Sequence, residues 1–309
     1  MYSKPALSVE NQIVRLKSRG LSFGDEAYAA NVLLNVGYYR MSGYWWPLQR
    51  EPRDGSHAFA PGATFERAVQ LYQFDRKLRQ ILGHGLERIE VAIRAKLIHH
   101  PSLEFDPWWF EDSALFTNTT DFAGNLGTIL REVNRSKQDF ITHHRGAYRA
   151  DGRLPPAWKS LEVTSFGTLS KLYKALAKGR SRNLIARELG WPNRGYLEFW
   201  LQVFTIVRNL CAHHARVWNT RLRIQYPVKV LSYRKDDWMQ LAPADRQRMY
   251  LPICGMVYTL RHVTRDQTVE RAVGHLLGEY EGIVDCTALG FPPDWREDSF
   301  WTPLVEPST

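Results

Sequence analysis

Apolar residues recur at helical spacing along most of the chain, and the strongest pattern lies in residues 196–219. With 3.6 residues per turn, six side chains of this segment fall on or beside one stripe, and Val203 and Ile206 widen it. The six are Leu197, Trp200, Leu201, Phe204, Val207 and Leu210. A helix that is apolar around so much of its circumference lies inside a bundle. We therefore predict a buried helix that runs from Tyr196 to Asn219 and ends in polar side chains.

A second long helix is predicted from Thr64 to His99, where apolar residues repeat at the same spacing. Gly83 and Gly85 lower the helix propensity of its middle, so a bend is expected there. Shorter helices are predicted at 8–20, 25–36, 121–144, 165–176, 181–189, 244–264 and 268–280, with a loop at 51–62 and an extended basic segment at 220–235. The predicted fold class is therefore all-α. It comprises an N-terminal helical segment (1–62) packed on a helical bundle (63–282), and a C-terminal tail (283–309) without regular structure over the surface.

Glu87 and Glu90 of the long helix could act as an acid/base pair. Arg88, Arg94 and Lys96 lie within a turn or two of them, however. Intrahelical ion pairs are therefore the predicted role of the two carboxylates.

The segment YYRMSGYWWPLQR at residues 38–50 is dense in aromatic side chains. Two interpretations fit it: burial against the bundle, or a platform on which RNA bases stack. Burial is the stronger prediction, because single-stranded RNA platforms usually expose their aromatic residues on sheets or loops.

The polar end of the 196–219 helix gathers Arg208, Asn209, His213, His214 and Arg216. Asn209 and His213 are four residues apart and share a face, which Arg216 is expected to continue. A guanidinium binds phosphate oxygens, and an imidazole can transfer a proton near neutral pH. RNA carries its own nucleophile, the 2′-hydroxyl, so this set suits RNA cleavage without a metal. The common alternative is a helix C-terminus whose basic residues face the helix dipole.

Positive charge is concentrated around the same segment. The net charge is +9, and residues 171–235 contain 14 Lys or Arg but only two Glu. Such a field attracts polyanions and makes their binding weaken steeply with salt. We expect RNA contacts from Lys171, Lys174, Arg180, Arg182, His214, Arg216 and Asn219. The alternative is a solvated surface that only aids solubility.

Other classes of protein have little support in the sequence. Three widely spaced cysteines suggest neither a disulfide framework nor a zinc knuckle, and Cys211 is expected to be a small buried residue. Paired histidines are adjacent and point to different sides, so no metal site is predicted. No glycine-rich phosphate loop occurs, and no cofactor is expected. With neither a signal peptide nor an apolar run of membrane-spanning length, we expect a cytoplasmic protein without a membrane partner.

Several blocks of the chain resemble the Abi-like (AbiD/AbiF type) abortive infection proteins. The string RNLCAHHARVWN at 208–219 is similar to their signature, which contains the Arg-x-x-x-x-His motif of the HEPN superfamily of ribonucleases. Further similar blocks follow the family order at 38–48, 71–97, 155–176 and 290–301. The resemblance implies an all-helical, HEPN-like bundle and a bacterial antiviral or toxin-like role. It also implies metal-independent RNA cleavage by paired sites, usually across a homodimer, and in some relatives a bound small non-coding RNA.

The resemblance assigns roles to three residues of the motif. Arg208 and His213 match the catalytic pair, and Asn209 matches the polar residue after the Arg. In the predicted mechanism His213 takes the 2′-hydroxyl proton or donates one to the 5′-oxygen, and Arg208 stabilises charge on the phosphoryl oxygens. Asn209 is expected to hold the imidazole in position.

Two alternatives to a ribonuclease stay open. A non-catalytic RNA-binding protein that holds a small non-coding RNA would bind RNA without cutting it. A DNA-binding regulator would use residues 183–201 as a helix-turn-helix, although the apolar side chains of its supposed recognition helix suit a core better than a major groove.

Overall fold

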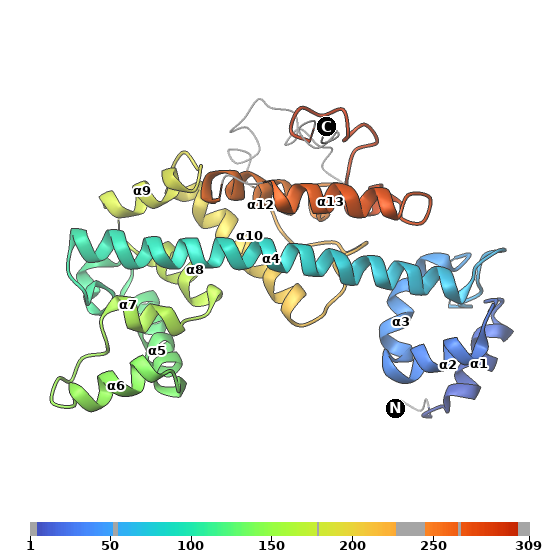
Figure 1. Ribbon diagram of the computed structural model, residues 1–309, viewed down its shortest axis with the longest axis horizontal. Helices are drawn as coiled ribbons and strands as arrows, with labels where there is room; N and C mark the ends of the chain where they lie inside the picture. The colour runs from blue at the N-terminus through green and yellow to red at the C-terminus, as the bar shows by residue number, and fades with distance from the viewer. Residues whose placement is uncertain (1–4, 52–54, 178, 227–244, 265–266, 302–309) are drawn as a thin grey trace.

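The helix α4 (Phe65–Glu104) is 40 residues long and forms the spine of the molecule (Figure 1). The computed structural model describes residues 5–51, 55–177, 179–226, 245–264 and 267–301. Within these ranges the chain forms α-helices, short 3₁₀ turns and loops, and β pairing is limited to isolated bridges. The predicted all-α class is confirmed.

Helices from both halves of the chain pack on α4. At its N-terminal end lie α1 (Val9–Ser18), α2 (Glu26–Asn35), α3 (Tyr38–Trp45) and η1 (Trp46–Leu48). At its C-terminal end lie η2 (Trp109–Glu111), η3 (Ser113–Leu115), α5 (Thr119–Arg135), α6 (Asp139–Ala147), α7 (Ala157–Ser160), η4 (Leu161–Val163), α8 (Phe166–Ala175) and α9 (Arg180–Glu188). The remaining elements are α10 (Arg194–Ala212), η6 (Asp245–Gln247), α12 (Tyr250–Val263), α13 (Thr268–Glu279) and η7 (Cys286–Leu289). None of the helices in the described ranges has both the length and the apolarity needed to cross a membrane.

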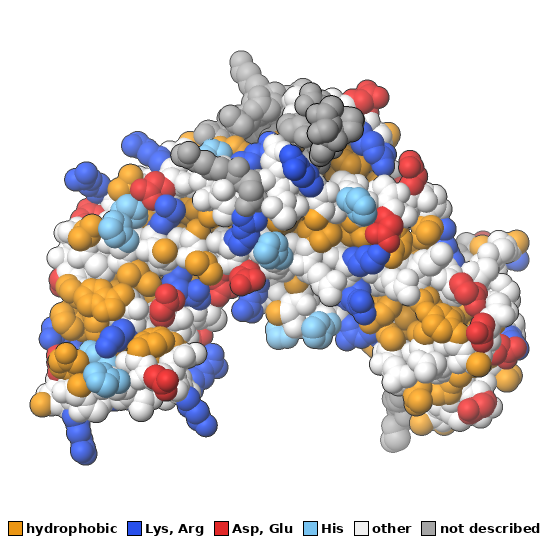
Figure 2. Space-filling view, viewed as in Figure 1, with side chains coloured by type: hydrophobic (Ala, Val, Ile, Leu, Met, Phe, Trp, Pro, Cys, Tyr) orange, Lys and Arg blue, Asp and Glu red, His pale blue; other side chains and the backbone are white. Residues whose placement is uncertain are grey.

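The elements form an arch around the end of α10. Figure 1 shows α12 and α13 along one side of α4, while α1–α3 and α5–α7 form two lobes on the opposite side. Helix α10 crosses α4, and its C-terminal end projects between the lobes (Figure 1). Figure 2 shows a hollow at this place, with basic and histidine side chains around it. The two lobes therefore frame the polar end of α10.

Side-chain caps place the starts of four helices where the sequence predicts them. The Ser8 hydroxyl accepts a hydrogen bond from the Asn11 amide at the start of α1. Asp25, Thr64 and Ser165 do the same at the starts of α2, α4 and α8. Because these caps satisfy amides that have no partner inside the helix, they fix where each helix begins.

Helix α4 continues without a break through Gly83 and Gly85, the two positions where the sequence predicts a bend. Gly83 faces the open side of α4, where an added Cβ would meet nothing within 4 Å. Gly85 faces α12 and α13, where a Cβ would lie 2.8 Å from Met256 Sδ and 3.3 Å from a methyl of Val269. The second glycine thus lets the spine approach the two C-terminal helices closely.

Two predicted helices have different bounds in the structure. The helix expected at 121–144 is two helices, α5 and α6, because Ser136 is extended and its hydroxyl accepts from the Gln138 amide. The helix expected to reach Asn219 ends at Ala212. The start of the helix expected at 244–264, and residues 227–235 of the expected extended segment, lie outside the described residues.

The apolar stripe of α10 is buried as predicted. Trp200 has no exposed surface and stacks on Trp191, with ring centroids 5.1 Å apart. Another neighbour is the backbone of α12 at Gly255, where an added Cβ would lie only 2.2 Å from the Trp200 ring. In the aromatic segment 38–50, Tyr44 and Trp45 are buried as predicted, at 1% and 2% exposure, whereas Tyr39 and Trp46 are exposed, at 93% and 40%.

The prediction that the C-terminal tail lies over the surface is wrong for the part of the tail that the structure describes. Trp295 and Trp301 are buried and pack edge to face, and Trp301 also contacts Phe291 and Tyr250 of α12. Burying these aromatic rings removes a large apolar area from water, so this irregular segment belongs to the core.

Two glycine substitutions should shift stability in opposite directions. Gly255→Ala forces a methyl group into the Trp200 ring and should lower the free energy of unfolding by about 1–3 kcal/mol. Gly83→Ala adds helix propensity without a clash and should raise it by up to about 1 kcal/mol. Urea unfolding followed by far-UV circular dichroism checks both. Equal effects of the two variants would contradict the close approach of α10 and α12.

Candidate active site

The last turn of α10 carries the predicted catalytic residues. His213 caps the helix, and its amide donates to the Asn209 carbonyl at 3.0 Å, so these two residues do lie one turn apart. His214 then adopts a left-handed backbone conformation with φ of 54°, which turns the chain away from the helix axis. Arg216 lies beyond this turn. The prediction that Arg216 continues the face of Asn209 and His213 is therefore wrong.

Helix α3 holds the turn that follows α10. The Arg40 guanidinium donates to the His214 carbonyl, and the Arg216 guanidinium donates to the Gly43 carbonyl. Both bonds join segments more than 170 residues apart in sequence. Arg216 therefore fixes the turn to the N-terminal lobe, which leaves it poorly placed for the phosphate contact expected of it.

A buried carboxylate on α4 holds the same turn from the other side. Asp75 is fully buried, and its Oδ1 accepts from the amides of Val217 at 3.0 Å and Trp218 at 2.6 Å. Its Oδ2 accepts from the Tyr44 hydroxyl at 2.6 Å and pairs with the Arg79 guanidinium. One side chain thus connects α3, α4 and the segment after α10.

The charges of this cluster are set by its surroundings. Burial raises the pKa of the Asp75 carboxyl, and the Arg79 guanidinium, the Tyr44 hydroxyl and the two backbone amides oppose that shift. Burial also raises the pKa of Tyr44, so its hydroxyl stays a neutral donor. Arg79 also lies 3.4 Å from the Ala215 carbonyl, which brings a third backbone group of the turn into the network.

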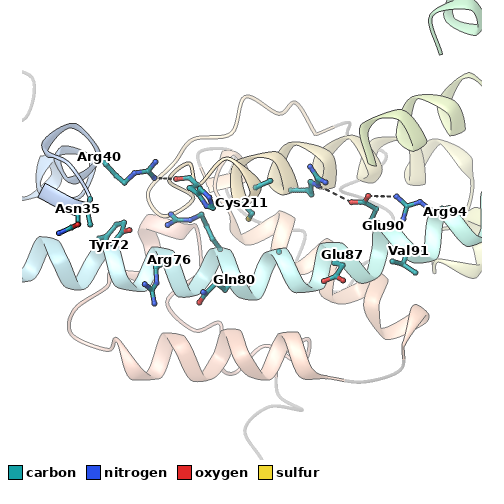
Figure 3. A pocket seen from close by; sticks show the side chains of 16 residues that line it. Asn35, Arg40, Tyr72, Arg76, Gln80, Glu87, Glu90, Val91, Arg94 and Cys211 are labelled. Carbon is teal, nitrogen blue, oxygen red and sulfur yellow. Dashed lines mark hydrogen bonds and ion pairs between the residues drawn. The ribbon is translucent and has the colours of Figure 1, made fainter. Parts of the chain in front are cut away.

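A cleft of about 1030 Å³ opens between α4, the ends of α2 and α3, and the C-terminal end of α10 (Figure 3). Its charged wall residues are Arg40, Arg76, Arg79, Arg94, Arg208, Glu87 and Glu90. Five guanidinium groups therefore face two carboxylates. An excess of positive charge in a concave site favours a polyanionic ligand.

Arg208 reaches the cleft from α10 and is positioned by Glu90 of α4. Its Nε lies 3.5 Å from Glu90 Oε2, and the other oxygen of Glu90 accepts from Arg94 at 2.9 Å (Figure 3). Arg94 in turn donates to the carbonyls of Leu161 at 3.1 Å and Thr164 at 2.9 Å. The predicted intrahelical pair of Glu90 is confirmed, and the same carboxylate also holds Arg208.

The structure brings only some of the predicted site residues into the cleft. Arg208 and His214 line it, whereas Asn209 and His213 are exposed beside it and form no part of its wall. Asn219 accepts a hydrogen bond from Arg248 at 2.8 Å through its side-chain oxygen. Asn219 therefore stabilises the chain after the turn.

The basic residues predicted on α8 and α9 lie away from the cleft. Lys171 and Lys174 line a separate hollow of about 350 Å³ between α5 and α8. Arg180 is exposed at the start of α9. Arg182 is only 3% exposed and pairs with Glu198 of α10. The expected RNA contact of Arg182 is wrong, because its guanidinium is used inside the protein.

Four residues that position the site were not singled out by the motif: Arg40, Asp75, Arg79 and Glu90. One feature of the sequence could have identified Asp75: it is a carboxylate that directly follows Phe74 within the apolar stripe of α4. A charged residue in such a stripe has to find a partner on folding. No such feature identifies Arg40, because its partner is a backbone carbonyl.

The described residues offer little to thiol or metal chemistry. Cys211 is buried as predicted, and burial raises the pKa of its thiol from 9.0 to about 12, which keeps it protonated. No group of three or more His, Cys, Asp or Glu side chains in the described ranges is arranged to hold a metal ion.

Comparison with known proteins adds one finding. The family described as "Abi-like protein" matches residues 31–219, from within α2 to the end of the turn after α10. The matched range contains all the charged residues of the cleft wall and the whole Asp75 network. No curated protein and no solved structure gives a significant match.

Removing the charge of Asp75 should destabilise the fold far more than removing one of its donors. Asp75→Asn leaves the Arg79 guanidinium buried without its counter-charge and should cost about 3 kcal/mol or more. Tyr44→Phe removes a hydroxyl that donates to Asp75 at 2.6 Å and accepts from Arg79 at 3.4 Å, and should cost about 1–2 kcal/mol. Chemical unfolding of both variants measures the difference. If Asp75→Asn were as stable as Tyr44→Phe, the turn would not depend on the carboxylate.

Proposed function

The chain belongs to the Abi-like protein family, and on this premise we propose that it is a metal-independent endoribonuclease of the HEPN type. Membership of the family suggests a role in abortive infection, the defence in which an infected cell stops its own growth. The proposed substrate is RNA, cut through its own 2′-hydroxyl. In this role the protein acts as an anti-phage effector or a toxin.

One observation carries the proposal: Arg208 stands in the wall of an electropositive cleft, five residues before an exposed histidine on the same helix end. The ion pair of Arg208 with Glu90 joins Nε and Oε2 at 3.5 Å, and no other described group pairs with this guanidinium. Because a guanidinium has five N–H donors, the terminal nitrogens remain available to phosphoryl oxygens. Glu90 holds the group in one orientation, which lowers the cost of binding the transition state.

The proton transfers fall to His213. The imidazole takes the proton of the 2′-hydroxyl while its oxygen attacks the phosphorus, or donates a proton to the departing 5′-oxygen. Arg208 stabilises the charge that develops on the non-bridging oxygens. The Asn209 carbonyl holds the amide of His213, and the Asn209 side chain lies one turn away, where it can orient the ring. No step requires a metal ion or cofactor from the residues described.

We further propose that the active form is a two-fold homodimer. A single α10 end presents one His213, whereas cleavage that forms a cyclic phosphate benefits from both an acid and a base. The end of α10 projects between the two lobes, where a second copy could present its own (Figure 1). A symmetric contact of this kind uses the same surface on both copies.

Loss of either catalytic side chain should abolish RNA cleavage without unfolding the protein. Removing His213 should lower the cleavage rate by about 10²–10⁴-fold, and removing Arg208 by about 10²–10³-fold. The measurement is cleavage of a labelled RNA by purified Arg208→Ala and His213→Ala protein in EDTA. Matched controls are Arg194→Ala at the other end of α10 and His275→Ala on α13, which should cut at the wild-type rate.

The outcome of this assay separates three functions. Undiminished cleavage by both active-site variants removes the ribonuclease proposal. RNA that co-purifies with the wild type and stays intact favours the non-catalytic protein that holds a small RNA. Equal competition by duplex DNA in a gel-shift assay favours the DNA-binding regulator.

The proposed dimer should be detectable in both the molecular mass in solution and the rate of RNA cleavage. Light scattering should give about twice the chain mass of 35.9 kDa at micromolar concentration. Specific activity should rise with protein concentration, because dilution separates the subunits by mass action. A mass of one chain together with a specific activity that does not change on dilution would contradict the dimer.

A further inference from the structure

The arginines of the cleft wall differ in how their charges are used. At the end near Arg208, the guanidinium groups of Arg94 and Arg208 share Glu90. Arg79 pairs with Asp75, and Arg40 donates to the His214 carbonyl. Arg76 is different. It is exposed in the cleft wall and has neither a hydrogen bond nor an ion pair within the described part of the chain.

Arg76 belongs to a row of three side chains with complementary chemistry. Tyr72, Arg76 and Gln80 are spaced by four residues, so they lie on one face of α4, and all three line the cleft (Figure 3). The Tyr72 ring is half-buried, with the edge of the Tyr44 ring against it at a centroid distance of 5.4 Å. That contact fixes an aromatic ring in the wall of the same cleft as the Arg76 guanidinium and the Gln80 amide.

These three groups match the parts of a nucleotide. An aromatic ring stacks with a base, a guanidinium binds a phosphate, and a carboxamide pairs with the polar edge of a base. The row lies at the histidine end of the cleft, because Arg79, three residues after Arg76, lies 3.4 Å from the Ala215 carbonyl, two residues after His213. Glu90, which pairs with Arg208, is 14 residues of continuous helix further on, about 21 Å along the axis.

We propose that Tyr72, Arg76 and Gln80 form a subsite that binds one nucleotide of a single-stranded RNA on the histidine side of the phosphate that is cut. The position of this nucleotide rests on the proposed function, because it is defined relative to the proposed site of cleavage. The existence of the subsite does not, since a bound and uncut RNA would occupy it equally.

The first experiment tests binding alone. A fluorescein-labelled single-stranded RNA of 12 nucleotides is titrated into protein that carries His213→Ala, with anisotropy as the readout. Adding Arg76→Ala should weaken binding about tenfold, the usual effect of losing one charge-assisted hydrogen bond. The slope of log K against log salt should fall by about 0.7, the value for one phosphate of a single strand.

The matched control is Arg15→Ala in the same background. Arg15 is an exposed arginine of α1 outside the cleft wall, so the substitution removes the same charge from the protein without touching the subsite. Arg15→Ala should leave both the affinity and the salt slope nearly unchanged. Equal weakening by Arg15→Ala and Arg76→Ala would overturn the subsite, because net charge alone would then explain the effect.

The second experiment uses the catalytically intact protein. Arg76→Ala should raise KM for the 12-nucleotide RNA with little change in kcat, because the subsite binds the strand without touching the reacting atoms. A fall in kcat with an unchanged KM would overturn the subsite. If the wild type does not cut this RNA, the proposed ribonuclease fails, and the binding experiment still decides the subsite.

Discussion

The buried carboxylate of Asp75 is the constraint on which the site depends. It satisfies two backbone amides of the segment after α10, a tyrosine hydroxyl of α3 and an arginine of its own helix. A loop that leaves a helix normally moves more than the helix itself. Here Asp75 accepts from two amides of the segment, and Arg40 and Arg216 add bonds between the segment and α3. The position of the helix end that carries His213 is therefore determined by residues far away in sequence.

The signature at 208–219 divides into two halves with different physical roles. Arg208, His213 and His214 face the solvent or the cleft, whereas Arg216, Val217 and Trp218 join the network around Asp75 and α3. One half is available to a ligand because the other is fully committed inside the protein. Reading the whole string as one catalytic face overlooks this division.

Local signals in the sequence predicted the helices well and the site only in part. Caps such as Ser8 and Thr64 depend on residues three positions apart, and the stripe of α10 depends on a regular period, so both can be read directly. The burial of Arg182 beside Glu198 and the pairing of Arg208 with Glu90 depend on which helices become neighbours. The same reason explains the tail, where Trp301 finds Tyr250 of α12. Charge counted along the chain therefore overestimated the basic surface of α9.

The unbroken course of α4 has a consequence for how this architecture can vary. Asp75 and Glu90 stand on one rod, the first holding the turn and the second holding Arg208. Inserting a single residue between them would rotate one relative to the other by about 100° and lengthen the rod by about 1.5 Å. Glu90 would then point away from α10 while Asp75 kept its place. The angle between the two carboxylates around the helix axis is thus fixed. The segment that joins them cannot gain or lose a single residue without turning Glu90 away from α10.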